Sequence, residues 1–169
     1  MRVGLPVAAA ILLSACAQLP SLPEPESCAS LAPLTAMLHI TRPGSDAQSL
    51  RVQGALEPAG YTWVVMNEVG VPGFIAVWEN SDLKIETRPT YRGPQPEWLL
   101  WGLHGWQRAM SGAECEPTPG YEIESIPGGR QIWRGESLAW QWKEGRPNRF
   151  TLPIPEIDVT VRQWNGGDE

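Results

Sequence analysis

The strongest evidence for the fold of this chain is the segment Tyr61-Thr-Trp-Val-Val-Met-Asn-Glu-Val-Gly-Val-Pro-Gly-Phe-Ile-Ala-Val-Trp78. It holds two apolar runs, residues 63–66 and 74–78, which are rich in β-branched and aromatic side chains. Such runs, separated by glycine and proline, predict two β-strands joined by a loop. Neither run alternates between polar and apolar residues, as a sheet with one solvated face would. We therefore expect both faces of this sheet to be covered, one of them by a helix or around a cavity.

Short runs and turns of this kind recur along the chain, which contains 17 glycines and 17 prolines. This composition is typical of many short strands and not of a helical bundle. Turns are expected at Pro43-Gly44, at residues 80–82 and at residues 127–129. The other strands are expected over residues 34–41, 50–56, 83–87, 121–126, 131–134, 138–143, 149–154 and 157–164.

One helix is expected, over residues 97–110. Leu99, Leu103, Trp106 and Met110 recur there at intervals of four, three and four residues, which makes one apolar stripe. The order of strands, one helix and then strands predicts a mainly β fold. We expect an antiparallel, strongly curved sheet of about nine to eleven strands, with the helix laid against its concave side.

The N-terminus has the features of a secretory signal. Arg2 is followed by the apolar residues 3–13 and then by small residues up to Cys16. At about 1.5 Å per residue this segment is too short to cross a bilayer core of roughly 30 Å, so it predicts a cleavable signal peptide. The run Leu13-Ser-Ala-Cys16 resembles the bacterial lipobox, which implies cleavage before Cys16 and lipidation of its thiol. An ordinary signal peptide with an incidental cysteine is the alternative.

Lipidation of Cys16 would anchor the protein nearly permanently, because two or three acyl chains bind a bilayer far more tightly than one. The next residue is Ala17 and not aspartate, which by the lipoprotein sorting rule favours the outer membrane, periplasmic face. We therefore divide the chain into a signal peptide (1–15), a lipidated, proline-rich tether (16–33), a domain (34–165) and a loose tail (166–169).

The two other cysteines are Cys28 and Cys115. In an oxidising compartment we expect them to form a disulfide, with two free thiols as the alternative. The chain has 13 Lys and Arg against 19 Asp and Glu and no basic run. This balance argues against a nucleic-acid-binding role.

Motifs of catalysis and metal binding are missing from the sequence. No His-x-x-His or Cys-x-x-Cys spacing occurs, and no Gly-x-Ser-x-Gly turn. The two histidines, His39 and His104, are far apart in the sequence and are more typical of surface or core positions. We expect no enzyme activity, no metal and no cofactor.

The order of elements over residues 50–164 resembles the LolA/LolB superfamily of lipoprotein carriers, and within it a family of short outer-membrane lipoproteins of LolB type. Residues 61–70 look like that family's strand entering a protruding loop, and residues 157–164 like its last strand. The resemblance implies a half-open barrel with a helical lid and an apolar cavity for acyl chains. It also implies a membrane-insertion loop: Val69 stands where the family has an exposed leucine, and Val71 extends the apolar tip.

The leading hypothesis is an outer-membrane lipoprotein that binds acyl chains of lipids or lipoproteins, and helps to carry or insert them, without catalysis. Its partners would be membrane lipid around Cys16, an acyl-chain or lipoprotein cargo, and a periplasmic carrier protein. The alternative is a structural or assembly lipoprotein that binds a protein partner and fills its interior with its own side chains. The expected lining of the acyl site is Trp63, Ile75 and Trp140 on the sheet and Leu99, Leu103 and Trp106 on the helix.

Overall fold

The computed structural model describes residues 31–58, 60–79, 82–111, 122–143, 149–152 and 157–163. The expected signal peptide, most of the tether and the tail lie outside the described residues. No helix in the described part of the chain is both long and apolar enough to cross a membrane.

The described residues form ten strands and one helix, and every strand pair is antiparallel. This confirms the expected mainly β, antiparallel architecture with a single helix between two groups of strands. The helix begins and ends within one residue of the expected bounds. The elements are β1 (Leu34–Thr41), β2 (Gln48–Glu57), β3 (Gly60–Asn67), β4 (Pro72–Glu79), β5 (Asp82–Thr87), α1 (Pro96–Ser111), β6 (Glu122–Ile126), β7 (Gly129–Arg134), β8 (Ser137–Lys143), β9 (Arg149–Leu152) and β10 (Ile157–Gln163).

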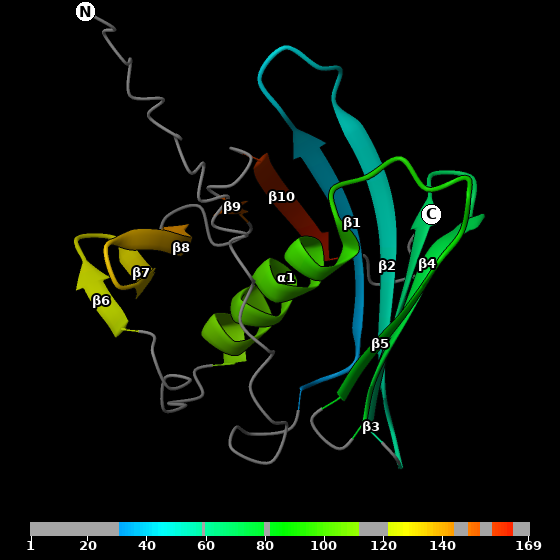
Figure 1. Ribbon diagram of the computed structural model, residues 1–169, viewed down its shortest axis with the longest axis horizontal. Coiled ribbons are helices and arrows are strands. Elements are labelled where there is room, and N and C mark those ends of the chain that lie inside the picture. The colour runs from blue at the N-terminus through cyan, green and yellow to red at the C-terminus, as the bar shows by residue number, and fades with distance from the viewer. Residues whose placement is uncertain are drawn as a thin grey trace, which may run out of the picture.

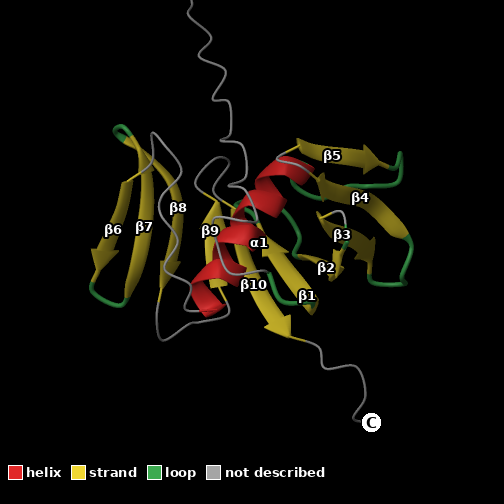
Figure 2. Cartoon of the chain, turned by 90° about the horizontal axis from the view of Figure 1, so that it is seen from below, coloured by secondary structure: helices red, strands yellow, loops and turns green. Residues whose placement is uncertain are grey.

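The strands follow the order β5-β4-β3-β2-β1-β10-β9-β8-β7-β6, so the first and last strands of the chain meet in the middle of the sheet. There Leu38 of β1 is directly opposite Val161 of β10. Between β8 and β9 the described residues form two pairs in register, fewer than at any other junction of the sheet. Strands β6–β8 therefore form a three-stranded arm beside a seven-stranded body, as Figure 2 shows. The sheet is open, because β5 and β6 are its edges.

Strands β3 and β4 alternate in burial although their sequences do not alternate in polarity. On β3, Trp63 and Val65 are buried and Val64 and Met66 are half-buried. This pattern defines an inner face, which carries the core, and an outer face. The apolar outer positions are partly shielded by their neighbours on the same face of the sheet.

Helix α1 lies against the inner face (Figure 1). The expected stripe is confirmed at Leu99, Leu103 and Trp106, which have almost no exposed surface. Gly102 lets the helix approach β9 closely: a Cβ at this position would lie 2.6 Å from a ring carbon of Phe150. Glu97 lies in the first turn, where a negative charge is favourable beside the helix dipole.

Aromatic rings fill the space between the helix and the sheet. The rings of Trp63 and Trp78 stack with centroids 6.2 Å apart, and Tyr61 lies 4.5 Å from Trp63. Gly54 faces inward on β2 and leaves room for the Tyr61 ring, since a Cβ there would lie 2.3 Å from the Tyr61 oxygen. The core is therefore continuous from β4 across to the helix.

Candidate functional site

Four of the residues expected to line an acyl site meet at the helix–sheet interface. Trp63, Leu99 and Leu103 are 0% exposed and Trp106 is 1% exposed. A side chain beside a space that admits a water-sized probe retains accessible surface, and these side chains retain almost none. The interface around these four residues is therefore filled by their neighbours.

The grouping of Ile75 with Trp63 is wrong. In the register between β3 and β4, Trp63 is opposite Ala76 and Val64 is opposite Ile75, so Ile75 lies on the outer face. Every residue from 74 to 78 is apolar, so the sequence of β4 gave no polarity signal for which set faces inward. The side chain of Trp140, the sixth expected residue, lies outside the described residues.

A buried polar contact joins the helix to the sheet at Gln107. Its Nε2 donates to the Tyr61 hydroxyl oxygen at 3.2 Å and to the Ala32 carbonyl oxygen at 3.4 Å. Its Oε1 accepts from Nε1 of Trp63 at 3.4 Å, and the Tyr61 hydroxyl donates to the Ala32 carbonyl at 2.9 Å. Burial raises the pKa of Tyr61, and the hydrogen bond from Gln107 partly offsets this rise. We call Gln107, Tyr61, Trp63 and Ala32 the Gln107 cluster.

Sequence reasoning missed Gln107, although a signal was present. The residue follows Leu99 and Leu103 at intervals of four, so it continues the apolar stripe as its one polar member. A polar side chain in a buried stripe needs hydrogen-bond partners. The neighbouring His104 is also buried, with its ring edge-on to Trp78 at 5.2 Å.

The connection between β3 and β4 presents two valines to solvent. Val69 is 82% exposed and Val71 is 47% exposed. Asn67 closes the loop: its Oδ1 accepts from the Val71 amide at 2.8 Å, and its own amide donates to the Val71 carbonyl at 3.0 Å. Gly70, at a φ of 85°, takes the left-handed conformation that the turn requires. We call residues 67–72 the valine tip.

A hollow of about 590 Å³ lies beside the valine tip. The β1–β2 connection contributes Arg42 and Asp46, the tip contributes Glu68 and Val69, and the segment between β5 and α1 contributes Arg92. In Figure 1 the β1–β2 connection is the loop that rises highest, at the end of the sheet where the chain returns from β5 to α1. The floor of the hollow lies beside Ile40, whose own side chain is buried in the core.

Tyr91, in the segment between β5 and α1, covers the core at this end of the sheet. Its ring packs edge-on against Phe74 with centroids 5.1 Å apart, and its hydroxyl donates to the Pro94 carbonyl at 2.7 Å. Burial raises the pKa of Tyr91, which the charge of Arg42 lowers and that of Glu97 raises. Arg42 is therefore close enough to Tyr91 to act on it electrostatically.

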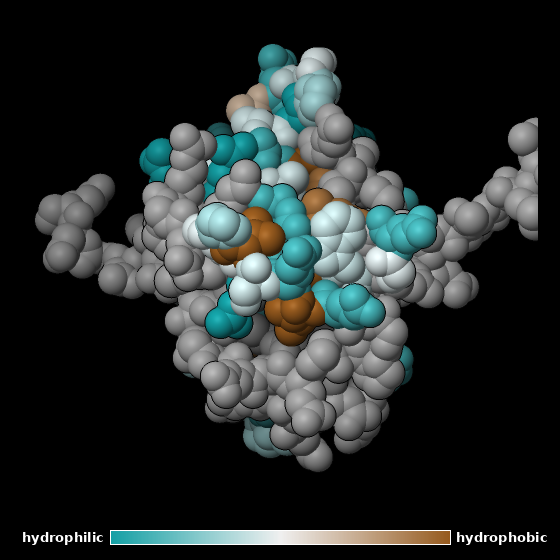
Figure 3. Space-filling model, turned by 90° about the vertical axis from the view of Figure 1, so that its left-hand side faces the viewer, coloured by the Kyte–Doolittle hydropathy of each residue, from teal (hydrophilic) through white to brown (hydrophobic). Residues whose placement is uncertain are grey.

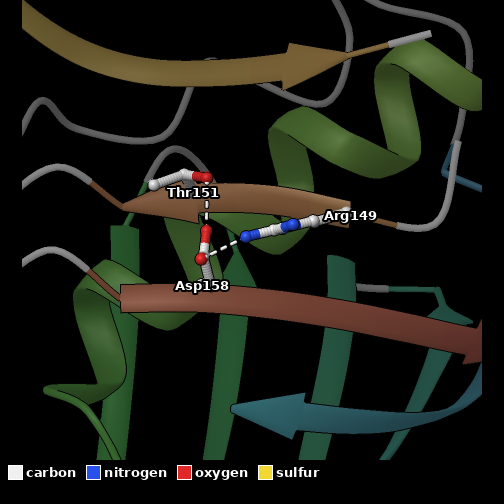
Figure 4. Close-up of polar contacts among 3 residues, drawn as sticks. All are labelled: Arg149, Thr151 and Asp158. Atoms are coloured by element: carbon white, nitrogen blue, oxygen red, sulfur yellow. Dashed lines mark hydrogen bonds and ion pairs between the residues drawn. The ribbon is translucent and has the colours of Figure 1, made fainter. Parts of the chain in front are cut away.

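The outer face carries a polar group at β9 and β10 (Figure 4). Asp158 accepts hydrogen bonds from Arg149, with which it forms an ion pair, and from the Thr151 hydroxyl at 2.7 Å. Both carboxylate oxygens are thus engaged, and the two donors come from the neighbouring strand. This arrangement joins the short strand β9 to β10.

A serine–histidine pair lies on the same face, where Ser49 Oγ is 2.9 Å from Nδ1 of His39. The two residues are directly opposite each other on β2 and β1. A nucleophilic serine also needs a third group that orients the histidine and donors for an oxyanion. No carboxylate contact of His39 is found within the described residues, so the pair is a cross-strand hydrogen bond.

The expected lipidation site and the expected disulfide lie outside the described residues. These sites are Cys16, Cys28 and Cys115, so lipidation and the disulfide stay predictions. Within the described residues no group of three His, Cys, Asp or Glu side chains could hold a metal ion.

Figure 3 views the side on which the β6–β8 arm lies, where small groups of hydrophobic residues lie among hydrophilic ones. On this arm Ile123 is 40% exposed.

Comparison of the chain with protein-family models, with curated protein sequences and with solved structures finds no significant match.

Proposed function

We propose that this protein is a non-catalytic lipid-binding lipoprotein, anchored in the outer membrane through Cys16 and facing the periplasm. It would bind acyl chains of lipids or lipoproteins and help to carry or insert them. The observation that carries the proposal is the valine tip. Two exposed valines are held by a hydrogen-bonded turn at the end of a sheet whose inner face is covered by one helix.

The valine tip suits contact with a membrane surface. Soluble domains normally leave apolar side chains exposed singly, whereas Val69 and Val71 share one turn. Full burial of one valine contributes roughly 1.5 to 3 kcal/mol, so two valines at a bilayer surface would give useful but reversible binding. The short turn limits the conformational entropy that is lost when the tip is buried.

Acyl chains would enter between α1 and the inner face of the sheet, the helix acting as the lid of a half-open barrel. Because this interface is filled, binding requires the helix to move away from the sheet. The Gln107 cluster opposes that movement. Once the helix–sheet interface opens, the apolar surface of Trp63, Leu99 and Leu103 would become available to the ligand. The ligand would then replace contacts that the helix makes in the closed form.

A binding measurement on two variants tests this proposal. A chain that begins after Cys16 is titrated with a fluorescent fatty acid, and tryptophan emission is recorded. If opening limits binding, the apparent dissociation constant is the intrinsic one divided by the open fraction. Gln107→Ala weakens the closed form and should tighten apparent binding several-fold, while Gln53→Ala, at an exposed position on the outer face, should not change it. Absence of binding to every form of the protein would refute the carrier role.

A second candidate function is a structural or assembly lipoprotein that binds a protein partner. The specific observation in its favour is the filled interior, since Trp63, Leu99, Leu103 and Trp106 leave no space at the interface. In this case the helix stays closed, and the exposed tip would contact a protein. The same titration separates the two, because a scaffold shows no fatty-acid binding in the wild type or in Gln107→Ala.

A further inference from the structure

We propose that the hollow beside the valine tip binds the zwitterionic headgroup of a phospholipid that carries a phosphate and a primary ammonium group. This inference rests on the proposed function only in assuming a membrane lipid as ligand. It concerns a site separate from the helix–sheet interface, and it does not require the helix to move.

The first argument is charge. Arg42 and Arg92 supply two positive charges to the hollow, and Asp46 and Glu68 supply two negative ones. Within the described residues none of these four side chains takes part in an ion pair. A balanced but unpaired set of this kind is complementary to a ligand with one group of each sign.

The second argument is the geometry of the arginines. Nη1 of Arg92 donates to the carbonyl oxygens of Pro89 at 2.6 Å and Tyr91 at 2.9 Å. These bonds hold the guanidinium in place, and no partner of Nη2 or Nε lies within the described part of the chain, so both can bind a ligand. Arg42 is half-buried, so it too has limited freedom. Arginine binds phosphate with two parallel hydrogen bonds, which a positioned guanidinium favours.

The third argument is location and size. The hollow shares Val69 with the valine tip, so a tip in contact with a bilayer would bring the hollow to the level of the headgroups. Its volume of about 590 Å³ lies in the range of small-molecule sites. Val69, which also lines the hollow and is 82% exposed, offers apolar surface where the ligand's glycerol and first methylenes would lie.

Binding of soluble headgroups to the purified full chain in a non-ionic detergent tests the inference. The probes are glycerophosphoethanolamine, glycerophosphocholine and inorganic phosphate, and binding is measured by calorimetry and by phosphorus NMR line broadening. Glycerophosphoethanolamine should bind most tightly. The choline compound has no N–H donor for the carboxylates, and inorganic phosphate has no cation, so each should bind at least fivefold more weakly.

Variants test which charged side chain binds which group of the ligand. Arg42→Gln and Arg92→Gln should each weaken glycerophosphoethanolamine binding about tenfold, as expected for the loss of a charge-assisted hydrogen bond. Glu68→Gln should weaken this probe but not inorganic phosphate. Arg88→Gln is the matched control, because Arg88 is exposed and paired with Glu86 at 2.8 Å and does not line the hollow. Its binding should equal that of the wild type.

Three results would overturn the inference. One is equal binding of inorganic phosphate and glycerophosphoethanolamine, which would mean an anion site only. The second is binding that Arg42→Gln and Arg92→Gln leave unchanged, and the third is no binding of any probe. Fatty-acid titration of the same variants reports on the interior, which these arginines do not line, so failure of the headgroup site and failure of acyl-chain binding can be told apart.

Discussion

Gln107 of α1 and Tyr61 of β3 are 46 positions apart in the chain, and the Gln107 amide donates to the Tyr61 hydroxyl oxygen across the helix–sheet interface at 3.2 Å. The same amide also satisfies the Trp63 indole N–H and the Ala32 carbonyl. One side chain thus joins the helix, the sheet and the segment that leads into β1. The helix is held by directional polar contacts as well as by apolar packing.

Gln107→Ala should therefore lower the free energy of unfolding by roughly 2 to 4 kcal/mol. The variant leaves the Trp63 N–H buried without its acceptor and opens a cavity at the interface. Urea denaturation monitored by tryptophan fluorescence measures the change. Gln53→Ala, on the solvated outer face, serves as the control and should stay within about 0.5 kcal/mol of the wild type. A Gln107→Ala variant as stable as this control would mean that the cluster contributes little.

Gly102→Ala should also destabilise the protein, although alanine has a higher helix propensity than glycine. Alanine favours a helix over glycine by about 1 kcal/mol. However, the new Cβ would lie 2.6 Å from Cε2 of Phe150 and 2.8 Å from Cδ2 of Leu152. Overpacking of this kind typically costs about 1 to 3 kcal/mol, so we expect a net loss.

A double-mutant cycle with Leu152→Ala checks the cause of that loss. Removing the Leu152 branch relieves one of the close contacts and leaves those with the Phe150 ring, so Gly102→Ala should cost less, but still destabilise, in the Leu152→Ala background. Additive effects of the two substitutions would show that the Leu152 contact contributes nothing to the cost at position 102.

Local patterns were enough to predict the strands and the helix. The runs around Trp63 and Phe74 have strong β propensity, and the spacing of Leu99, Leu103 and Trp106 marks one helix face. The pairing of β1 with β10 could not be predicted, because it joins the two ends of the domain and depends on contacts that are distant in sequence. The open sheet and its three-stranded arm could not be predicted for the same reason, because they too depend on contacts that are distant in sequence.

The site was less predictable than the fold. Ile75 and Ala76 are both apolar, so only the register with β3 reveals that Ile75 faces outward. The hollow gathers Arg42, Glu68 and Arg92 from three separate connections, and no pattern within one segment links them. Val69 and Val71 were expected to form a tip through a family resemblance, and the structure exposes both.

Tyr91 should make stability fall at alkaline pH. Burial raises its pKa in the folded state above the value of 10.0 that it has when exposed. Above pH 10 the unfolded chain releases this proton and the folded chain keeps it, so the folded state binds more protons and stability falls as pH rises. Below pH 10 both states keep the proton, and the stabilising effect is fully present.

The pKa of Tyr61 is raised as well, so both tyrosines contribute to the loss of stability at alkaline pH. Tyr91→Phe removes the titration of Tyr91 and so measures the part of this loss that Tyr91 causes. At neutral pH the variant should lose about 1 kcal/mol with the hydrogen bond to Pro94. Between pH 10 and 11 its stability should fall less steeply than that of the wild type. Equal slopes in the two proteins would contradict burial of the Tyr91 hydroxyl.

Cys16→Ser should leave the protein without an acyl chain. The basis is the lipobox resemblance of Leu13-Ser-Ala-Cys16. Cells fed a tagged fatty acid should label the wild type and not the variant, whereas Cys28→Ser should be labelled normally. Equal labelling of Cys16→Ser and the wild type would remove the anchor from the proposal.

Val69→Asp should slow the transfer of a bound fluorescent fatty acid from the protein to phospholipid vesicles by about tenfold. A charge at the tip opposes its burial in the bilayer surface, where an unpaired carboxylate is costly. Folding stability should not change, because Val69 is 82% exposed. Ile123→Asp is the matched control: Ile123 is an exposed apolar residue on the β6–β8 arm, and its substitution should leave the transfer rate unchanged. If both variants slow transfer equally, the effect follows from net charge and the tip has no special role. If neither does, the valine tip does not insert.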